Sequence, residues 1–401
     1  MTKARQKLKL AIIAGEPSGD LLGADLIAAL GMHVEHPLEL VGVGGDAMKA
    51  AGLKSLFDYH DLSIIGISAI VAQLPKLIMH IRRTTRAIIA AQPDVLVIID
   101  SPAFTHRVAR NIRKAMPNVL IVNYVCPTVW AWKPERAPAM TGYIDHVLSV
   151  FPFEAELVAR LGGPPLTYVG HRLAGDAALQ DVSNLQALKP SAAKENDDGT
   201  IAPAPLCLIM PGSRRGELKR LLPPFAETAH LLAERMPGVR FHIPTLPRLE
   251  AEVRSAAASW SVPVEVTATD EEKWQAFARA DAALAASGTV LLELALGKIP
   301  CVSAYKLDFL ANLIIKRVTV WSVALPNLIA DYPAINEYIN ESLRPGLIAR
   351  RLERLMQETT ERHQILMEFE KVRAVMRTQR APAEISADVI IDLLAAKAAN
   401  T

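Results

Sequence analysis

A strand, a glycine-containing turn, a helix and a second strand follow one another between Asp281 and Lys306, in the run DAALAASGTVLLELALGKIPCVSAYK. Residues 282–286 are apolar enough for a buried strand, and Gly297 and Pro300 end the helix that follows it. Units of this kind, repeated along a chain, build a parallel sheet that helices cover on both faces.

The turn of this unit is a candidate anion site. Ser287, Gly288 and Thr289 open the helix, and backbone N–H groups at a helix start have no partner within the helix. A diphosphate is a ligand of the right charge. We expect Glu293 in the first helical turn, where its carboxylate interacts with the helix start or accepts hydrogen bonds from ribose hydroxyls. An ordinarily capped helix explains this segment equally well.

The composition indicates a globular protein of more than one domain. The chain has 401 residues, of which 51% are hydrophobic and 21% charged, so two domains of about 180–200 residues are expected. The net charge of +2 gives no indication of nucleic-acid binding. Cys126, Cys207 and Cys301 lie far apart without metal-ligand spacing, as in a reduced cytoplasmic protein. The apolar run near the start is short and is interpreted as a strand, not a signal peptide.

The first half of the chain alternates apolar runs with helical stretches. Its strand candidates are residues 8–14, 38–43, 95–99, 120–124 and 146–150. A turn containing Glu16, Ser18, Gly19 and Asp20 follows the first of these, at the strand end where open α/β sheets bind ligands. The turn does not match GxGxxG, so a nicotinamide cofactor is poorly supported. A plain strand-to-helix turn remains the alternative.

Asp100 directly follows the apolar run of residues 95–99, which places a carboxylate at the carboxyl edge of a buried strand. A sparsely solvated carboxylate there has a raised proton affinity suited to base catalysis. A helix-capping Asp is the structural alternative. His171, Glu16 and Asp20 are competing candidates for the base. Downstream, the aromatic segment 124–133 either packs in the core or lines a sugar or lipid site.

A basic, apolar segment spans residues 62–92. It carries Lys76, Arg82, Arg83 and Arg86 and no acidic residue. Such a surface can lie on an anionic bilayer, whereas a helix packed on the core with a solvated basic face is the alternative. Pro75 and the clustered charges argue against a transmembrane span.

Residues 181–205 are polar and rich in Pro and Ala, and we interpret them as an interdomain linker. This gives an N-terminal domain over 1–180, a C-terminal domain over 206–345 and helices over 346–401, one of which could cross back to the first domain. The second domain opens with the strand 206–210, followed by a glycine turn in which Ser213 and Arg214 are placed to bind phosphate.

Taken together, eight ordered motifs resemble the lipid-A-disaccharide synthase family. They are Gly15–Asp20, Ile99–Pro102, Val129–Trp132, Phe151–Glu154, Val169–His171, Pro211–Arg214, Ser287–Thr289 with Glu293, and Leu325–Asn327. The resemblance runs from about residue 8 to residue 340 and implies an α/β fold of two Rossmann-like parallel-sheet domains facing each other, the GT-B architecture. It also implies an inverting, metal-independent enzyme without cofactor that joins UDP-2,3-diacylglucosamine to 2,3-diacylglucosamine 1-phosphate and releases UDP.

The resemblance carries residue roles with it. Asp100 becomes the general base. The donor side comprises Ser213, Arg214, Ser287, Gly288, Thr289, Glu293 and Asn327, and the acceptor side comprises Glu16, Ser18, Gly19, Asp20 and His171. The sequence departs from the family pattern at Ala69, Ala103 and Thr105, all on the acceptor side.

The expected partners are the two lipid substrates and the anionic surface on the cytoplasmic face of the inner membrane, with a homodimer possible and nucleic acid not expected. Two other classes of function stay open at this point. One is a UDP-sugar epimerase of the same fold, and the other is a non-catalytic lipid or nucleotide sensor.

Overall fold

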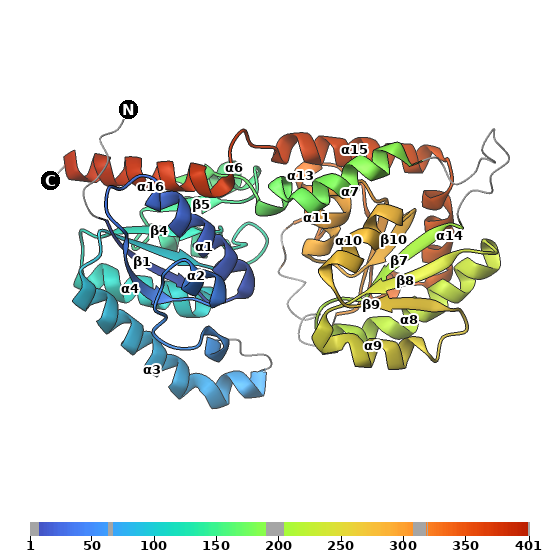
Figure 1. The fold of residues 1–401 in the computed structure, drawn as a ribbon, viewed down its shortest axis with the longest axis horizontal. Helices are drawn as coiled ribbons and strands as arrows, with labels where there is room; N and C mark the ends of the chain where they lie inside the picture. Colours follow the sequence, from blue (N-terminus) through green and yellow to red (C-terminus); the bar gives the residue numbers. More distant parts are fainter. Residues whose placement is uncertain (1–7, 63–66, 190–203, 308–317, 319, 400–401) are drawn as a thin grey trace. The chain divides into compact units, whose positions relative to one another are not determined.

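A computed structural model describes residues 8–62, 67–189, 204–307, 318 and 320–399 (Figure 1). The chain forms two compact units, one of Met1–Arg172 with Thr378–Thr401 and the other of Leu173–Arg377. Each unit contains a six-stranded sheet in which all strand pairs are parallel. The predicted α/β fold of two Rossmann-like domains is confirmed.

The first unit has the strand order β2-β1-β3-β4-β5-β6. Its strands are β1 (Lys9–Ala14), β2 (Glu39–Val43), β3 (Val95–Ile99), β4 (Leu120–Tyr124), β5 (His146–Ser149) and β6 (Leu166–Tyr168). Its helices are α1 (Pro17–Gly31), α2 (Asp46–Ala50), α3 (Ile67–Ala91), α4 (Pro102–Ala115), α5 (Arg136–Met140), α6 (Glu154–Arg160) and α16 (Pro382–Ala399).

Both faces of this sheet are buried. Along β1, Leu10 and Ile12 pack in a core cluster with side chains of α1 and α16, whereas Ala11 and Ile13 pack in a second cluster with side chains of α3 and α4. The alternation follows from the strand period of two, which sends successive side chains to opposite faces. Figure 1 shows α1 and α16 on one side of the sheet and α3 and α4 on the other.

The second unit has the strand order β12-β11-β10-β7-β8-β9. Its strands are β7 (Leu206–Met210), β8 (Arg240–Pro244), β9 (Val264–Thr267), β10 (Ala282–Ala285), β11 (Cys301–Tyr305) and β12 (Asn336–Ile339). Its helices are α7 (Ala177–Leu188), α8 (Arg215–Arg235), α9 (Glu250–Ala257), α10 (Asp270–Arg279), α11 (Thr289–Leu296), α13 (Leu325–Ala330), α14 (Pro345–Met356) and α15 (Thr360–Met376).

Each sheet has one point at which the chain changes its direction of winding. In the first unit the chain goes from β1 to β2 on one side and then to β3 on the other, and in the second unit the corresponding neighbours are β7 and β10. Loops at the carboxyl ends of two such strands diverge and leave a crevice, where open α/β sheets bind ligands. The topology therefore gives each unit one expected binding position.

The domain boundaries differ from those expected. The units divide at Arg172, and the start of the predicted linker belongs to α7, which packs against α10 and α11. Helices α14 and α15 pack on the second unit, and α16 lies against α1 of the first. The part of the linker at 190–203 lies outside the described residues, as do residues 63–66 of the basic segment.

Candidate active site

Asp100 lies at the carboxyl end of β3, beside the point where the winding of the first sheet changes. Asp100 and Ser101 both have a positive φ, 51° and 43°, which L-residues adopt at a cost. The buried hydroxyl of Thr105 donates hydrogen bonds to the carbonyl oxygens of Asp100 (2.7 Å) and Ser101 (3.1 Å). Thr105, a departure from the family pattern, thus holds the turn that presents the carboxylate.

The turn after β1 packs directly on this carboxylate. A Cβ atom at Gly15 would lie 2.3 Å from Oγ of Ser101, and one at Gly19 would lie 3.0 Å from Oδ2 of Asp100. Glycine is therefore required at Gly15 for the two turns to approach. The hydroxyl of Ser18 lies 3.5 Å from Oδ2 of Asp100, at the limit of a hydrogen bond. The structure thus brings together Ser18, Gly19 and Asp100, which the sequence predicted separately.

The environment raises the pKa of Asp100 from 3.8 to about 6. Burial is the main cause, because it disfavours the charged carboxylate, and the negative charge of Glu16 adds to it. The hydrogen bond from Ser18 acts in the opposite direction. A carboxylate with a pKa near the working pH can accept a proton efficiently, so the site is suited to general-base catalysis.

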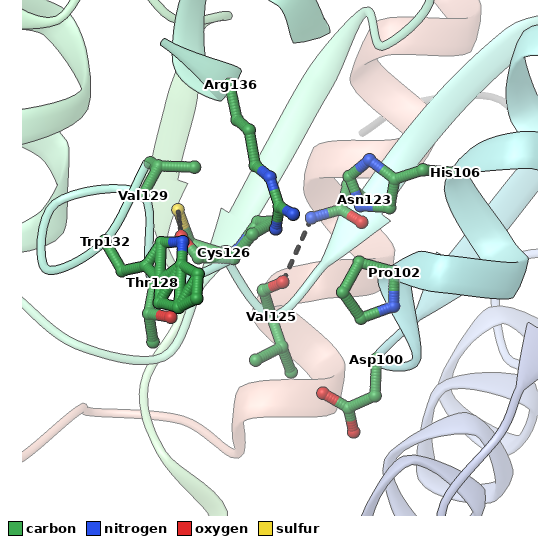
Figure 2. A pocket seen from close by; sticks show the side chains of 11 residues that line it. Asp100, Pro102, His106, Asn123, Val125, Cys126, Thr128, Val129, Trp132 and Arg136 are labelled. Carbon is green, nitrogen blue, oxygen red and sulfur yellow. Dashed lines mark hydrogen bonds between the residues drawn. The ribbon is translucent and has the colours of Figure 1, made fainter. Parts of the chain in front are cut away.

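Asp100 lines a pocket of about 430 Å³ (Figure 2). The other lining residues are Pro102, His106, Asn123, Val125, Cys126, Pro127, Thr128, Val129, Trp132 and Arg136. In Figure 2 the guanidinium of Arg136 and the amide of Asn123 appear at one end of the pocket, and the carboxylate of Asp100 appears at the other. Arg136, His106 and Asn123 were not predicted, because only the fold brings them to Asp100.

The two tryptophans of the aromatic segment after β4 lie in different surroundings. Trp130 is 8% exposed, and its Nε1–H donates to Oε1 of Glu154 over 2.9 Å. Ser149 donates a hydrogen bond to the other carboxylate oxygen of Glu154. Trp130 therefore packs in the interior and anchors the loop, whereas Trp132 lines the pocket.

Two residues expected on the acceptor side have other partners. The carboxylate of Asp20 is buried and accepts hydrogen bonds from the backbone N–H groups of Gly45 (2.6 Å), Ala47 (2.9 Å) and Met48 (3.2 Å) at the start of α2. Asp20 therefore holds the loop after β2. The ring of His171 stacks on Phe151, and burial lowers the pKa of His171 to about 4. Asp100 is consequently the stronger base of the two at neutral pH.

The second unit contains a pocket of about 360 Å³ at its own change of winding, between the ends of β7 and β10. It brings together six of the residues predicted for the donor side, Ser213, Arg214, Ser287, Gly288, Thr289 and Glu293. Thr245, Leu246, Thr269 and Lys273 also line it and were not predicted.

Three helices begin at this pocket, and they differ in whether a side chain accepts hydrogen bonds from the free backbone N–H groups of their first turn. At α8, Oε2 of Glu217 accepts from the N–H groups of Ser213 (3.0 Å) and Arg214 (3.2 Å). At α10, the hydroxyl of Thr269 accepts from the N–H of Glu272 (3.2 Å). At α11, no side chain within the described part of the chain caps the N–H groups of residues 288–290. The start of α11 is therefore the open anion site of the three.

Glu293 is the fifth residue of α11, just past the first turn in which it was expected. The helix begins at Thr289, so its first turn holds no acidic residue. Oε2 of Glu293 pairs with Nζ of Lys273 over 2.8 Å, and both side chains are largely buried at the pocket wall. Glu293 therefore faces the pocket with a cationic partner and does not cap its own helix.

Asn327 is engaged elsewhere than expected. It is 1% exposed, its Nδ2–H donates to the carbonyl of Ile335 (2.9 Å), and its Oδ1 accepts from the N–H of the same residue (2.8 Å). The side chain joins α13 to the segment before β12 and does not line the pocket. A contact between Asn327 and a donor thus has no support in this geometry.

One face of α3 is both cationic and apolar. Ile78 (41% exposed) and Met79 (55% exposed) precede the exposed Arg82, Arg83 and Arg86 at helical spacing. Ile81 and Ile88 are buried on the opposite face. Lys76, expected on the same surface, pairs instead with Asp61 over 2.7 Å.

Two further features concern the described residues only. None of their helices has the length and apolar character needed to cross a bilayer. They also contain no cluster of three His, Cys, Asp or Glu side chains that would suit a metal ion.

Comparison with known sequences decides the family. The sequence model described as Lipid-A-disaccharide synthetase matches residues 10–390. A lipid-A-disaccharide synthase of Nitrobacter winogradskyi is 43% identical over 393 residues, which cover 98% of this chain and 97% of the relative. The synthase of Bradyrhizobium diazoefficiens is 41% identical over 387 residues, 96% of each chain.

The chain belongs to the lipid-A-disaccharide synthase family. It is therefore a hexosyltransferase of lipid A biosynthesis, as the motifs predicted.

Solved structures agree on the fold of this synthase family member. UDP-GlcNAc 2-epimerase from Neisseria meningitidis, bound to UDP-GlcNAc, matches 97% of this chain and 100% of its own with a TM-score of 0.58 at 12% identity. Acinetobacter baumannii MurG matches 96% of this chain and 99% of its own with a TM-score of 0.58 at 13% identity. At such identities the likeness concerns the fold alone. The epimerase alternative is not favoured, because the high identity is to synthases.

Proposed function

We propose that this chain transfers the diacylglucosamine unit of UDP-2,3-diacylglucosamine to the 6-hydroxyl of 2,3-diacylglucosamine 1-phosphate, with Asp100 as the general base. Family membership supports the two substrates. The observation that carries the role of Asp100 is its position. It is a half-buried carboxylate with a pKa of about 6, on a pocket at the change of winding in the first sheet.

The reaction is a single displacement. Asp100 accepts the proton of the 6-hydroxyl while the hydroxyl oxygen attacks the anomeric carbon of the donor. The bond between that carbon and the diphosphate oxygen breaks, UDP leaves with the electron pair, and the anomeric configuration inverts. The turn Asp100–Ser101, which Thr105 holds at positive φ, fixes the direction of the carboxylate.

The pocket of the second unit is proposed to hold UDP. The uncapped start of α11 suits the diphosphate because its N–H groups and the helix dipole attract negative charge. Arg214 and Lys273 line the same pocket, where they pair with Glu217 and Glu293, and they are the cationic side chains proposed to contact the leaving group as it becomes more negative. Glu293 is the candidate for the ribose hydroxyls, because a carboxylate accepts two hydrogen bonds from a diol.

The exposed face of α3 is proposed to lie on an anionic bilayer. Ile78 and Met79 would enter the headgroup region, and Arg82, Arg83 and Arg86 would contact lipid phosphates. Both substrates carry acyl chains, so a peripheral enzyme on the cytoplasmic face of the inner membrane would reach them where they reside.

Release of UDP from the diacylated donor tests the proposal. With the purified chain, UDP should form only when 2,3-diacylglucosamine 1-phosphate is added, and a disaccharide phosphate should appear in equal amount. Formation of UDP without acceptor, or no UDP in either reaction, would contradict it. Incubation with UDP-GlcNAc alone serves as the control for epimerisation and should give no epimer.

A further inference from the structure

A second, cationic pocket adjoins the pocket of Asp100. It has a volume of about 310 Å³ and shares Pro102, His106, Pro127 and Arg136 with the first, so the two form one continuous depression. Its remaining lining residues are Ala103, Arg107, Arg110, Met140 and Tyr143. It is thus lined by three arginines and no carboxylate.

The three arginines have no acidic partner within the described residues. Arg107 and Arg110 lie on α4, and Arg136 is the first residue of α5. None of them forms an ion pair with a described carboxylate, although Arg113, also on α4, pairs with Asp145 over 2.6 Å. Like charges gathered without a counter-charge repel one another, so their arrangement favours an anionic ligand.

Hydrogen bonds and a cation–π contact hold the floor of this second pocket in place. Nη2 of Arg110 donates to the hydroxyl of Tyr143 over 3.1 Å, and its guanidinium lies over the Tyr143 ring at 4.6 Å from the centroid. Nδ1 of His106 lies 2.9 Å from the same hydroxyl. Burial, together with the charges of Arg110 and Arg136, lowers the pKa of His106 to about 4, so at neutral pH its ring adds no charge. Arg107 and Arg136 are exposed and remain able to contact a ligand.

We infer that this pocket binds a phosphomonoester, the 1-phosphate of the acceptor sugar. The inference rests on the proposed function. Asp100 and Arg136 lie at different ends of one pocket, and Asn123 is at the end of Arg136 (Figure 2). The acceptor carries its attacking hydroxyl on one side of the ring oxygen and its phosphate on the other. A site that binds this acceptor therefore needs a catalytic base near the hydroxyl and a cationic group near the phosphate. Asp100 and Arg136 meet these two requirements at the two ends of the continuous pocket. The diphosphate of the donor is assigned to the other unit, so it leaves this pocket free.

Substitution of the exposed arginines tests the assignment. Initial rates with saturating donor are measured for 2,3-diacylglucosamine 1-phosphate and for the same diacylglucosamine without phosphate. The parent should prefer the phosphorylated acceptor. In Arg136→Gln, and separately in Arg107→Gln, the ratio of the two kcat/KM values should fall roughly 10- to 100-fold, the size expected for lost charge-assisted hydrogen bonds. Arg160→Gln, on a surface arginine of the same unit that pairs with Glu156, is the matched control and should keep the parent ratio.

The possible results distinguish an error in the phosphate site from an error in the proposed function. Absence of UDP release by the parent with either acceptor would refute the proposed function. Normal UDP release, with an unchanged acceptor ratio in both variants, would refute only the phosphate site. A lipid headgroup is the other source of a phosphomonoester. If Arg136→Gln reduces binding to phosphatidic acid vesicles while the acceptor ratio stays at the parent value, the pocket binds membrane lipid and the inference is overturned.

Discussion

The hydroxyl of Ser18 lies 3.5 Å from Oδ2 of Asp100 and joins the start of α1 to the carboxyl end of β3. This hydrogen bond lowers the pKa of Asp100, whereas burial and the charge of Glu16 raise it. Two residues of the turn after β1 thus adjust the proton affinity of the proposed base in opposite directions.

The pH dependence of activity should follow this balance. Because a base must be deprotonated to act, kcat/KM should fall as the pH decreases through about 6, the pKa of Asp100. Glu16→Gln removes a cause that raises this pKa and should move the acidic limb to lower pH. Ser18→Ala removes a cause that lowers it and should move the limb to higher pH. Profiles of kcat/KM against pH check both shifts. If the acidic limb has the same position in the parent and in both variants, Asp100 is not the general base.

Stability should respond to the same titration. The folded chain holds the Asp100 proton more tightly than the unfolded chain, because its pKa is about 6 against 3.8. The contribution of Asp100 to the free energy of unfolding is therefore present below pH 3.8 and is lost as the pH rises to about 6. Asp100→Asn abolishes the titration, so relative to the parent it should gain about 1–3 kcal/mol between pH 4 and pH 7. Urea unfolding at both pH values measures this difference, and a variant whose difference from the parent is independent of pH would contradict the burial of a titrating carboxyl.

The donor pocket gives a binding prediction. Glu293→Ala removes the proposed acceptor of the ribose hydrogen bonds and should weaken UDP binding by about 1–3 kcal/mol. Glu250→Ala, on a partly exposed carboxylate of the same unit that pairs with Arg254, should leave UDP affinity at the parent value. Titration calorimetry decides the matter. Equal UDP affinity in a folded Glu293→Ala protein would place the ribose elsewhere.

The α3 surface predicts membrane binding that depends on salt. Each basic residue near an anionic bilayer contributes about 1 kcal/mol, and added salt screens this attraction. Replacing Arg82, Arg83 and Arg86 by Gln should reduce sedimentation with phosphatidylglycerol vesicles and leave UDP affinity unchanged. Neutral vesicles are the control for the lipid charge. A triple variant that sediments like the parent would point to a different surface.

The sequence predicts those parts of the fold that lie deep in the two sheets. β3 and β7 are apolar at every position, because a parallel strand covered on both faces buries all of its side chains. β8 and β9 were not recognised. Their interior includes His242, whose ring bonds the hydroxyl of Thr267 over 2.8 Å, and β9 lies at the sheet edge with Glu265 exposed. Polar pairing and edge exposure remove the apolar run by which strands are recognised.

The sequence predicts those site residues that lie in a turn directly after a strand. It does not predict the residues that only the folded chain brings close to them. Asp100 and the turn of Ser287 are adjacent in sequence to buried strands, so their position follows from topology. Lys273 lies in the first turn of α10 and Arg136 is the first residue of α5, and nothing local in the sequence relates them to Glu293 or Asp100. The sequence predicts Asp20 on the acceptor side because it belongs to the turn that follows β1. Its side chain instead accepts hydrogen bonds from the backbone at the start of α2.

The turnover of Asp100→Asn tests the central claim most directly. The amide has nearly the shape of the carboxylate but cannot accept the proton, and general-base catalysis typically contributes about 10²–10⁴-fold. Measured as acceptor-dependent UDP release at saturating substrates, kcat should fall by that factor while calorimetry gives the parent affinity for UDP. A variant that turns over at the parent rate would contradict the account, because the proton of the 6-hydroxyl would then leave by another route.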